Sequence, residues 1–143
     1  MKLRLVTVGK PKLAYAKAGF EEYLARLQRL HTVRVTHLAD KYAADAAKFR
    51  EVITGSYVVA LEITGEDLDS SSLAEFLKAR ELASREVSIV IGGPDGLPDE
   101  IRTQADFRWS LSRLTLPHDL AMVVTLESLY RASMMNAGLP YHR

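Results

Sequence analysis

The chain has 143 residues, of which 48% are hydrophobic and 26% charged, with a formal net charge of +1. This length fits one domain with a substantial core, the composition excludes a disordered chain, and the lack of cysteine excludes disulfides, thiol nucleophiles and cysteine-bound zinc. Without a long apolar run or a signal-peptide pattern, we expect a single cytoplasmic domain over residues 1–143 and no membrane partner.

The first half of the chain alternates strand and helix patterns. Lys2 to Val8 is rich in Leu and Val and predicts a strand. Apolar residues then recur at three- and four-residue steps, which predicts a helix from Lys12 to Leu30. His31 to Leu38 predicts a second strand, and Ala43 to Thr54 predicts a second helix. Ser56 to Thr64 is a nearly continuous β-branched run, which is typical of a strand covered on both faces.

The second half continues the alternation. Ser72 and Glu75 form a capping-box pattern, which predicts the start of a third helix at Ser72. The remaining predicted elements are a buried strand from Glu86 to Ile91, a helix from Pro98 to Gln104, a strand from Phe107 to Leu111 and a helix from His118 to Met135. Strands and helices that alternate throughout predict an α/β layered fold with a mostly parallel sheet.

Two loops of the predicted sheet are candidate ligand sites, because ligands of open α/β sheets bind beyond the carboxyl ends of the strands. Residues 91–97 carry three glycines directly after a buried strand, which indicates either close approach of the backbone to a ligand or a tight structural turn. Residues 111–118 mix leucines with hydroxyl groups, so this loop either holds an adenosine or fills the core as a buried crossover. Neither loop has a phosphate-binding fingerprint.

Other features of the sequence leave alternatives open. Basic residues gather in residues 1–34, which indicates either a face for nucleic acid or an ordinary solvated helix face. The final residues 138–143 are either a functional tail or a frayed terminus. The four histidines have no metal-ligand spacing, and we therefore expect no metal.

Several motifs in this order carry a family resemblance. They are Ile91-Gly92-Gly93-Pro94, Trp109-Ser110-Leu111-Ser112, Leu114-Thr115-Leu116-Pro117-His118, Glu127-x-Leu129-Tyr130-Arg131-Ala132 and Pro140-Tyr141-His142. Over its whole length the chain resembles the ribosomal RNA large subunit methyltransferase H family. The resemblance implies a SPOUT-type α/β/α fold with a C-terminal trefoil knot. It also implies a homodimer that transfers a methyl group from S-adenosylmethionine to N3 of a pseudouridine in a 23S ribosomal RNA stem-loop, on the assembled ribosome.

The resemblance also implies site residues. Its S-adenosylmethionine pocket falls on Leu61, Gly92, Gly93, Leu111, Ser112, Arg113, Leu114, Thr115 and Leu116. Its catalytic or RNA-engaging groups fall on Arg131, Tyr141 and His142, and His142 is a candidate proton acceptor. Many members of the family place an arginine where this chain has Met122, which weakens the inference about the RNA substrate. The alternative function is a ribosome-associated binding or assembly factor with the same fold and little methyl transfer.

Overall fold

The computed structural model describes residues 1–141, and these residues build one five-stranded sheet. The strands are β1 (Lys2–Val8), β2 (Thr32–Leu38), β3 (Tyr57–Asp67), β4 (Val87–Ile91) and β5 (Phe107–Ser110). Their order in the sheet is β2-β1-β4-β3-β5, and every neighbouring pair is parallel. The predicted α/β fold is therefore confirmed, and the sheet is parallel throughout.

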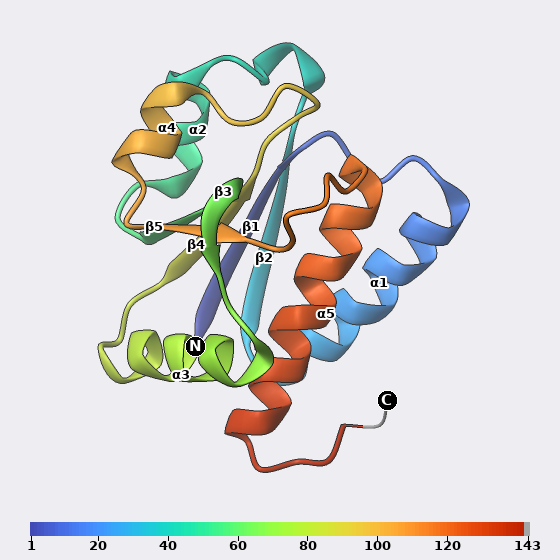
Figure 1. The fold of residues 1–143 in the computed structure, drawn as a ribbon, viewed down its shortest axis with the longest axis vertical. Coiled ribbons are helices and arrows are strands. Elements are labelled where there is room, and N and C mark those ends of the chain that lie inside the picture. The colour runs from blue at the N-terminus through green and yellow to red at the C-terminus, as the bar shows by residue number, and fades with distance from the viewer. Residues whose placement is uncertain (142–143) are drawn as a thin grey trace.

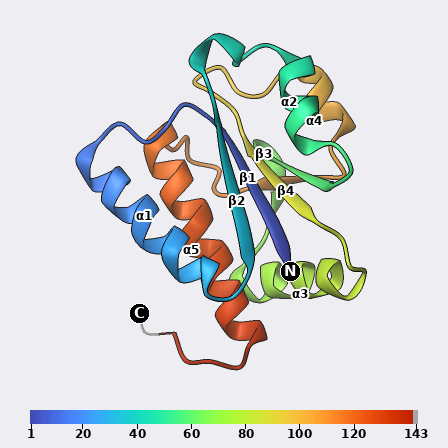
Figure 2. The ribbon, with the colours of Figure 1, turned by 180° about the vertical axis from the view of Figure 1, so that it is seen from behind.

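Helices cover both faces of this sheet (Figures 1 and 2). On one face lie α1 (Ala14–Gln28), α3 (Ser70–Leu82) and α5 (His118–Asn136), whose buried side chains share one core cluster with β1 and β4. On the other face lie α2 (Ala46–Ile53) and α4 (Asp99–Gln104), which pack on a second cluster. A short 3-10 helix, η1 (Asp40–Tyr42), precedes α2. The result is a three-layer α/β/α arrangement.

The alternation of side chains along β1 explains why both faces are covered. Leu3 and Leu5 belong to the cluster under α1, α3 and α5, whereas Val6 and Val8 belong to the cluster under α2 and α4. Successive side chains of a strand point to opposite faces, so an apolar run needs a partner layer on each side. All five residues of β4, the middle strand, are buried.

The start of α3 differs from the prediction. The capping box at Ser72 and Glu75 is wrong, because the helix begins two residues earlier, at Ser70. Asp69 is the N-cap, and its carboxylate accepts a hydrogen bond from the backbone N–H of Ser72 at 2.7 Å. Aspartate is as good an N-cap as serine, so the carboxylate that lies one position before the serine run takes the role.

Strand β3 interrupts its regular pairing with β5 for four residues before it ends. Its ladder with β5 runs to Leu61, breaks, and resumes at Glu66. The intervening residues 62–65 form an excursion, and Gly65 lies directly against β5. A Cβ atom on Gly65 would stand 2.7 Å from the carbonyl carbon of Arg108, which is closer than a side chain tolerates. The excursion turns residues 62–64 toward the carboxyl edge of the sheet, where they border a cavity.

Candidate functional site

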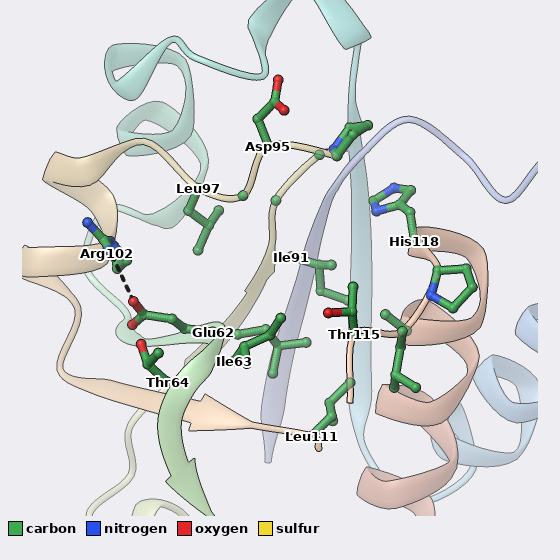
Figure 3. A pocket seen from close by; sticks show the side chains of 18 of the residues that line it. Glu62, Ile63, Thr64, Ile91, Asp95, Leu97, Arg102, Leu111, Thr115 and His118 are labelled. Atoms are coloured by element: carbon green, nitrogen blue, oxygen red, sulfur yellow. Dashed lines mark hydrogen bonds and ion pairs between the residues drawn. The ribbon is translucent and has the colours of Figure 1, made fainter. Parts of the chain in front are cut away.

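A cavity of about 820 Å³ lies at the carboxyl ends of β3, β4 and β5 (Figure 3). This volume falls within the range of small-molecule sites, and the position is the one where open parallel sheets bind ligands. Three segments form the walls: the end of β3 with its excursion, the glycine loop after β4, and the loop between β5 and α5. Segments that are far apart in the sequence thus meet in one site.

Most of the residues assigned to the cofactor pocket line this cavity. They are Leu61, Gly92, Gly93, Leu111, Ser112, Leu114, Thr115 and Leu116. Arg113, the ninth, is not among the lining residues; its side chain is 89% exposed and its Nε atom lies 3.5 Å from a carboxylate oxygen of Asp67. The structure therefore brings the two loops chosen from the sequence together with the end of β3.

The glycine loop is both a tight turn and a wall of the cavity. The backbone N–H of Gly96 donates a hydrogen bond to the carbonyl of Gly93 at 2.9 Å, and Gly96 has a φ of +83°. Gly92 has an ordinary φ, but a Cβ atom there would lie 2.5 Å from the carbonyl carbon of Gly96. Glycine is needed at Gly92 so that the loop can close on its own backbone, a reason that the sequence did not reveal.

The loop between β5 and α5 combines apolar side chains with unused backbone donors. The hydroxyl of Ser112 accepts from the N–H of Leu114 at 3.0 Å, which holds the turn. Within residues 1–141, the backbone N–H groups of Thr115 and Leu116 have no hydrogen-bond partner. Leucine walls and available backbone donors fit an adenosyl group, which has flat apolar faces and a polar edge. The cavity thus fits S-adenosylmethionine.

A carboxylate that the sequence did not single out faces the cavity from the excursion of β3. The side chain of Glu62 is 13% exposed, and it accepts a hydrogen bond from Arg102 of α4 at 3.0 Å, the interaction drawn in Figure 3. Arg108 approaches its other oxygen at 3.8 Å. The sequence placed Glu62 inside a predicted strand of apolar residues, and its approach to Arg102 depends on the tertiary structure.

The first two residues of α5 tie this helix to the segment between β1 and α1. His118 lines the cavity, and its ring Nε2–H donates to the carbonyl of Val8 at 2.7 Å. The buried carboxylate of Asp119 accepts from the backbone N–H groups of Lys12 and Leu13 at 2.8 and 2.7 Å. The wall formed by the loop between β5 and α5 therefore ends at a fixed anchor on β1 and on the segment that leads into α1.

This anchor predicts a pH-dependent contribution to stability. Burial alone would raise the pKa of Asp119, but the backbone N–H groups of Leu13 and Lys12 and the nearby His118 and Lys12 charges lower it below its usual value. The lowered pKa means that the stabilisation is complete above the pKa of an unfolded aspartate, about 3.9, and is lost as the pH falls through the folded-state pKa.

We therefore expect Asp119→Asn to lower the free energy of unfolding at pH 7 by about 2 kcal/mol, since hydrogen bonds to a charged group are lost. The difference from the wild type should shrink as the pH falls below about 4. Urea unfolding at several pH values measures both effects. Asp45→Asn is the control, because Asp45 is an exposed N-cap of α2 and asparagine caps equally well. Equal losses in the two variants would contradict the anchor.

The groups assigned to catalysis lie away from the cavity. Ala121 is the last α5 residue that lines it, and Arg131 lies ten residues further along the same helix, a rise of about 15 Å. The carboxylate of Glu127 contacts Arg131 at 3.1 Å, and it accepts a hydrogen bond from Tyr141 at 2.8 Å. His142 lies outside the described residues. Arg131 and Tyr141 thus contact each other, and neither of them lines the cavity of its own chain.

Three further observations concern residues 1–141. Met122, the position at which the resemblance implies an arginine in many family members, is fully buried in the core cluster under α5. Among residues 1–141, no group of three or more His, Cys, Asp or Glu side chains is arranged to hold a metal ion. No helix in the same part of the chain is long and apolar enough to cross a membrane.

Comparisons with known proteins agree with the site. The family model described as "Predicted SPOUT methyltransferase" matches residues 1–142. A ribosomal RNA large subunit methyltransferase H from Deinococcus radiodurans is 46% identical over 100% of this chain and 99% of its own length. The protein of the same name from Acinetobacter baumannii is 36% identical over the same shares of the two chains.

A solved structure supports the fold. The structure of a probable methylase family protein from Haemophilus influenzae aligns with a TM-score of 0.62 and 13% identity, over 99% of this chain and 70% of that one. This likeness concerns the fold alone, whereas the identities above extend over the full length of the relatives. The chain therefore belongs to the ribosomal RNA large subunit methyltransferase H family of SPOUT methyltransferases.

Proposed function

We propose that this protein transfers the methyl group of S-adenosylmethionine to N3 of a pseudouridine in a stem-loop of 23S ribosomal RNA, on the assembled ribosome. One observation carries the proposal: in a chain that belongs to this family, the cavity is lined by eight of the nine residues expected to hold the methyl donor. Its leucines suit the adenosyl group, as do the N–H groups of Thr115 and Leu116, which have no hydrogen-bond partner in the described part of the chain. A ribosomal substrate also implies action in the cytoplasm.

The chemistry needs positioning and charge stabilisation. When bound, S-adenosylmethionine supplies a methyl group on a positively charged sulfur, and the protein's task is to place the ring nitrogen in line with it. The N3–carbon bond forms as the carbon–sulfur bond breaks, the electron pair stays on sulfur, and the N3 proton passes to an acceptor. Arg131 would stabilise the negative charge on a neighbouring carbonyl of the base, with Tyr141 beside it. His142 is our candidate for the proton acceptor.

We propose that the reaction uses two copies of the chain. Neither Arg131 nor Tyr141 lines the cavity of its own chain, and the backbone of Arg131 lies about 15 Å along α5 beyond Ala121, the last α5 residue of the lining. Met135 and Leu139, beside these groups, and Leu13 and Tyr15 of the α1 end are exposed apolar side chains that a partner would cover. We therefore propose a homodimer in which Arg131 and Tyr141 of each chain complete the cavity of the other.

Two structural expectations accompany this function. The SPOUT family is characterised by a trefoil knot near the C-terminus, and we propose the same knot for the segment that runs from the glycine loop through α5. We also propose that residues 1–143 act as one methyltransferase domain, since one sheet includes strands from both halves of the chain.

Labelled methyl transfer tests the proposed function. The protein is incubated with S-adenosylmethionine carrying a labelled methyl group and with assembled ribosomes, isolated large subunits or naked 23S RNA from cells that lack this protein. We expect label on a pseudouridine of 23S RNA in assembled ribosomes and little on naked RNA. Cofactor binding without label on any of the three would instead favour a ribosome-associated assembly factor.

A further inference from the structure

One carboxylate oxygen of Glu127 contacts both Arg131 and Tyr141, the two side chains proposed to act on the reacting base. Its Oε2 atom accepts hydrogen bonds from Arg131 Nε at 3.2 Å and from the Tyr141 hydroxyl at 2.8 Å. The Arg131 guanidinium carbon also lies 4.3 Å from the centre of the Tyr141 ring. The three side chains form one compact unit, the Glu127 cluster, on the last turns of α5.

The chain reverses direction after α5, and this reversal brings Tyr141 to Glu127. Helix α5 ends at Asn136, and Gly138 follows with a φ of +69°. The N–H groups of Gly138 and Leu139 donate to the carbonyls of Met135 and Met134 at 3.1 and 3.0 Å, which fixes the turn after the helix. The tail therefore returns along α5, and Tyr141 reaches a residue that precedes it by fourteen positions.

The surroundings of Tyr141 favour a fixed, protonated hydroxyl. Burial raises the pKa of Tyr141 well above its ordinary value, and the hydrogen bonds to Tyr23 and Glu127 add to this effect. At neutral pH the phenol therefore keeps its proton and donates a hydrogen bond to the carboxylate of Glu127. The ring packs edge-on against Tyr130 at a centroid distance of 5.0 Å. The hydroxyl is held by the carboxylate and the ring by its neighbour.

We propose that Glu127 is a positioning residue for methyl transfer, which holds Arg131 and Tyr141 in the orientation that the reacting base requires. The inference rests on the proposed function of those two residues. Arginine has high rotamer entropy, and the carboxylate fixes one edge of its guanidinium while the Tyr141 ring covers a face. Nη1 makes no hydrogen bond within residues 1–141 and remains available to a carbonyl oxygen.

The alternative is an ordinary ion pair on a helix surface, because Glu127 and Arg131 are four residues apart. Such exposed pairs contribute little. The pair of Glu22 and Arg26 on α1 is an example, with a longer separation of 3.6 Å and more exposed side chains, and within residues 1–141 no third side chain hydrogen-bonds to its carboxylate. The Glu127 pair differs because both side chains are about two-thirds covered and a third group shares the same oxygen.

Steady-state kinetics on ribosomes test the proposal. Glu127→Gln keeps the shape but removes the charge, and we expect kcat to fall by about 10–100-fold while the affinity for S-adenosylmethionine stays at the wild-type value, because misplaced groups slow the chemical step. In the background of Arg131→Ala and Tyr141→Phe, the same change should cost less than about twofold, because residues that act as one unit are not additive. Glu51→Gln on α2, which breaks a pair with Lys48, is the control.

Each other result overturns the inference in a distinguishable way. Wild-type kcat in Glu127→Gln, with kcat strongly reduced but measurable in Arg131→Ala, would refute the positioning role and leave the proposed function intact. An equal loss of kcat with and without Arg131 and Tyr141 would show that Glu127 acts on the fold alone. If the wild-type protein transferred no methyl group to any RNA, the proposed function would fail first and the inference with it.

Discussion

Gly92→Ala is expected to weaken S-adenosylmethionine binding by about 10–100-fold. Overpacking a site costs about 1–3 kcal/mol, and each 1.4 kcal/mol raises the Kd about tenfold. The added Cβ would stand 2.5 Å from the carbonyl carbon of Gly96 and 2.6 Å from the nitrogen of Leu97. Both are backbone atoms, so the clash is relieved by moving the loop that lines the cavity. Isothermal titration calorimetry with the purified protein measures the change.

The neighbouring glycine provides a matched control. A Cβ on Gly93 would meet side chains of Ala43 and Val8 at 3.5 Å, which is ordinary van der Waals contact. Gly93→Ala should therefore bind S-adenosylmethionine within about threefold of the wild type, since a substitution that creates no clash usually costs about 0.5 kcal/mol or less. Comparable losses at the two positions would mean that flexibility of the loop, and not the close approach at Gly92, governs binding.

Mixing two impaired variants is expected to restore methyl transfer. At an S-adenosylmethionine concentration far below the Kd of Gly92→Ala, the cavity of that variant stays largely empty. Arg131→Ala removes the cation on α5, so each homodimer should have little activity on ribosomes. In a mixed dimer, the intact cavity of one chain meets the intact Arg131 of the other. Random exchange makes half of the dimers mixed, each with one active site of two, and activity should reach about a quarter of the wild-type value.

The outcome decides whether the two parts of the site act within one chain or across two. Activity at the sum of the separate variants, with exchange of chains verified by differently tagged copies, would refute the homodimer in which chains complete each other. The same measurement with Gly93→Ala in place of Gly92→Ala should give higher activity, because that variant has an intact cavity in its own right.

Much of the fold followed from local patterns in the sequence. The apolar run of β4 is buried at all five positions, and the predicted strand from Lys2 to Val8 is confirmed at both ends. The spacing of apolar residues along a helix or strand is a property of neighbouring positions in the sequence, so it can be recognised without the tertiary structure. The start of α3 was missed because Asp69 and Ser72 both suit helix starts, and the sequence alone does not rank them.

The candidate site was predicted less completely. The two loops were identifiable because glycines and hydroxyl groups follow buried strands, and both loops line the cavity. Glu62 was missed because its role depends on the break in the β3 ladder after Leu61, which involves a partner strand more than forty residues away. The clustering of Glu127 with Tyr141 was hidden for a similar reason, because a chain reversal brings them together.

The core under α5 has a consequence for biosynthesis. Leu3 and Leu5 of the first strand pack in the same cluster as Leu126 and Leu129 of the last helix. Strand β1 therefore leaves the exit tunnel of a translating ribosome well before its partners in α5 have been made. Non-local contacts of this kind delay folding until both partners are present. The core therefore closes only after α5 has emerged, so a nascent chain truncated before α5 should be a substrate for chaperones and not an active enzyme.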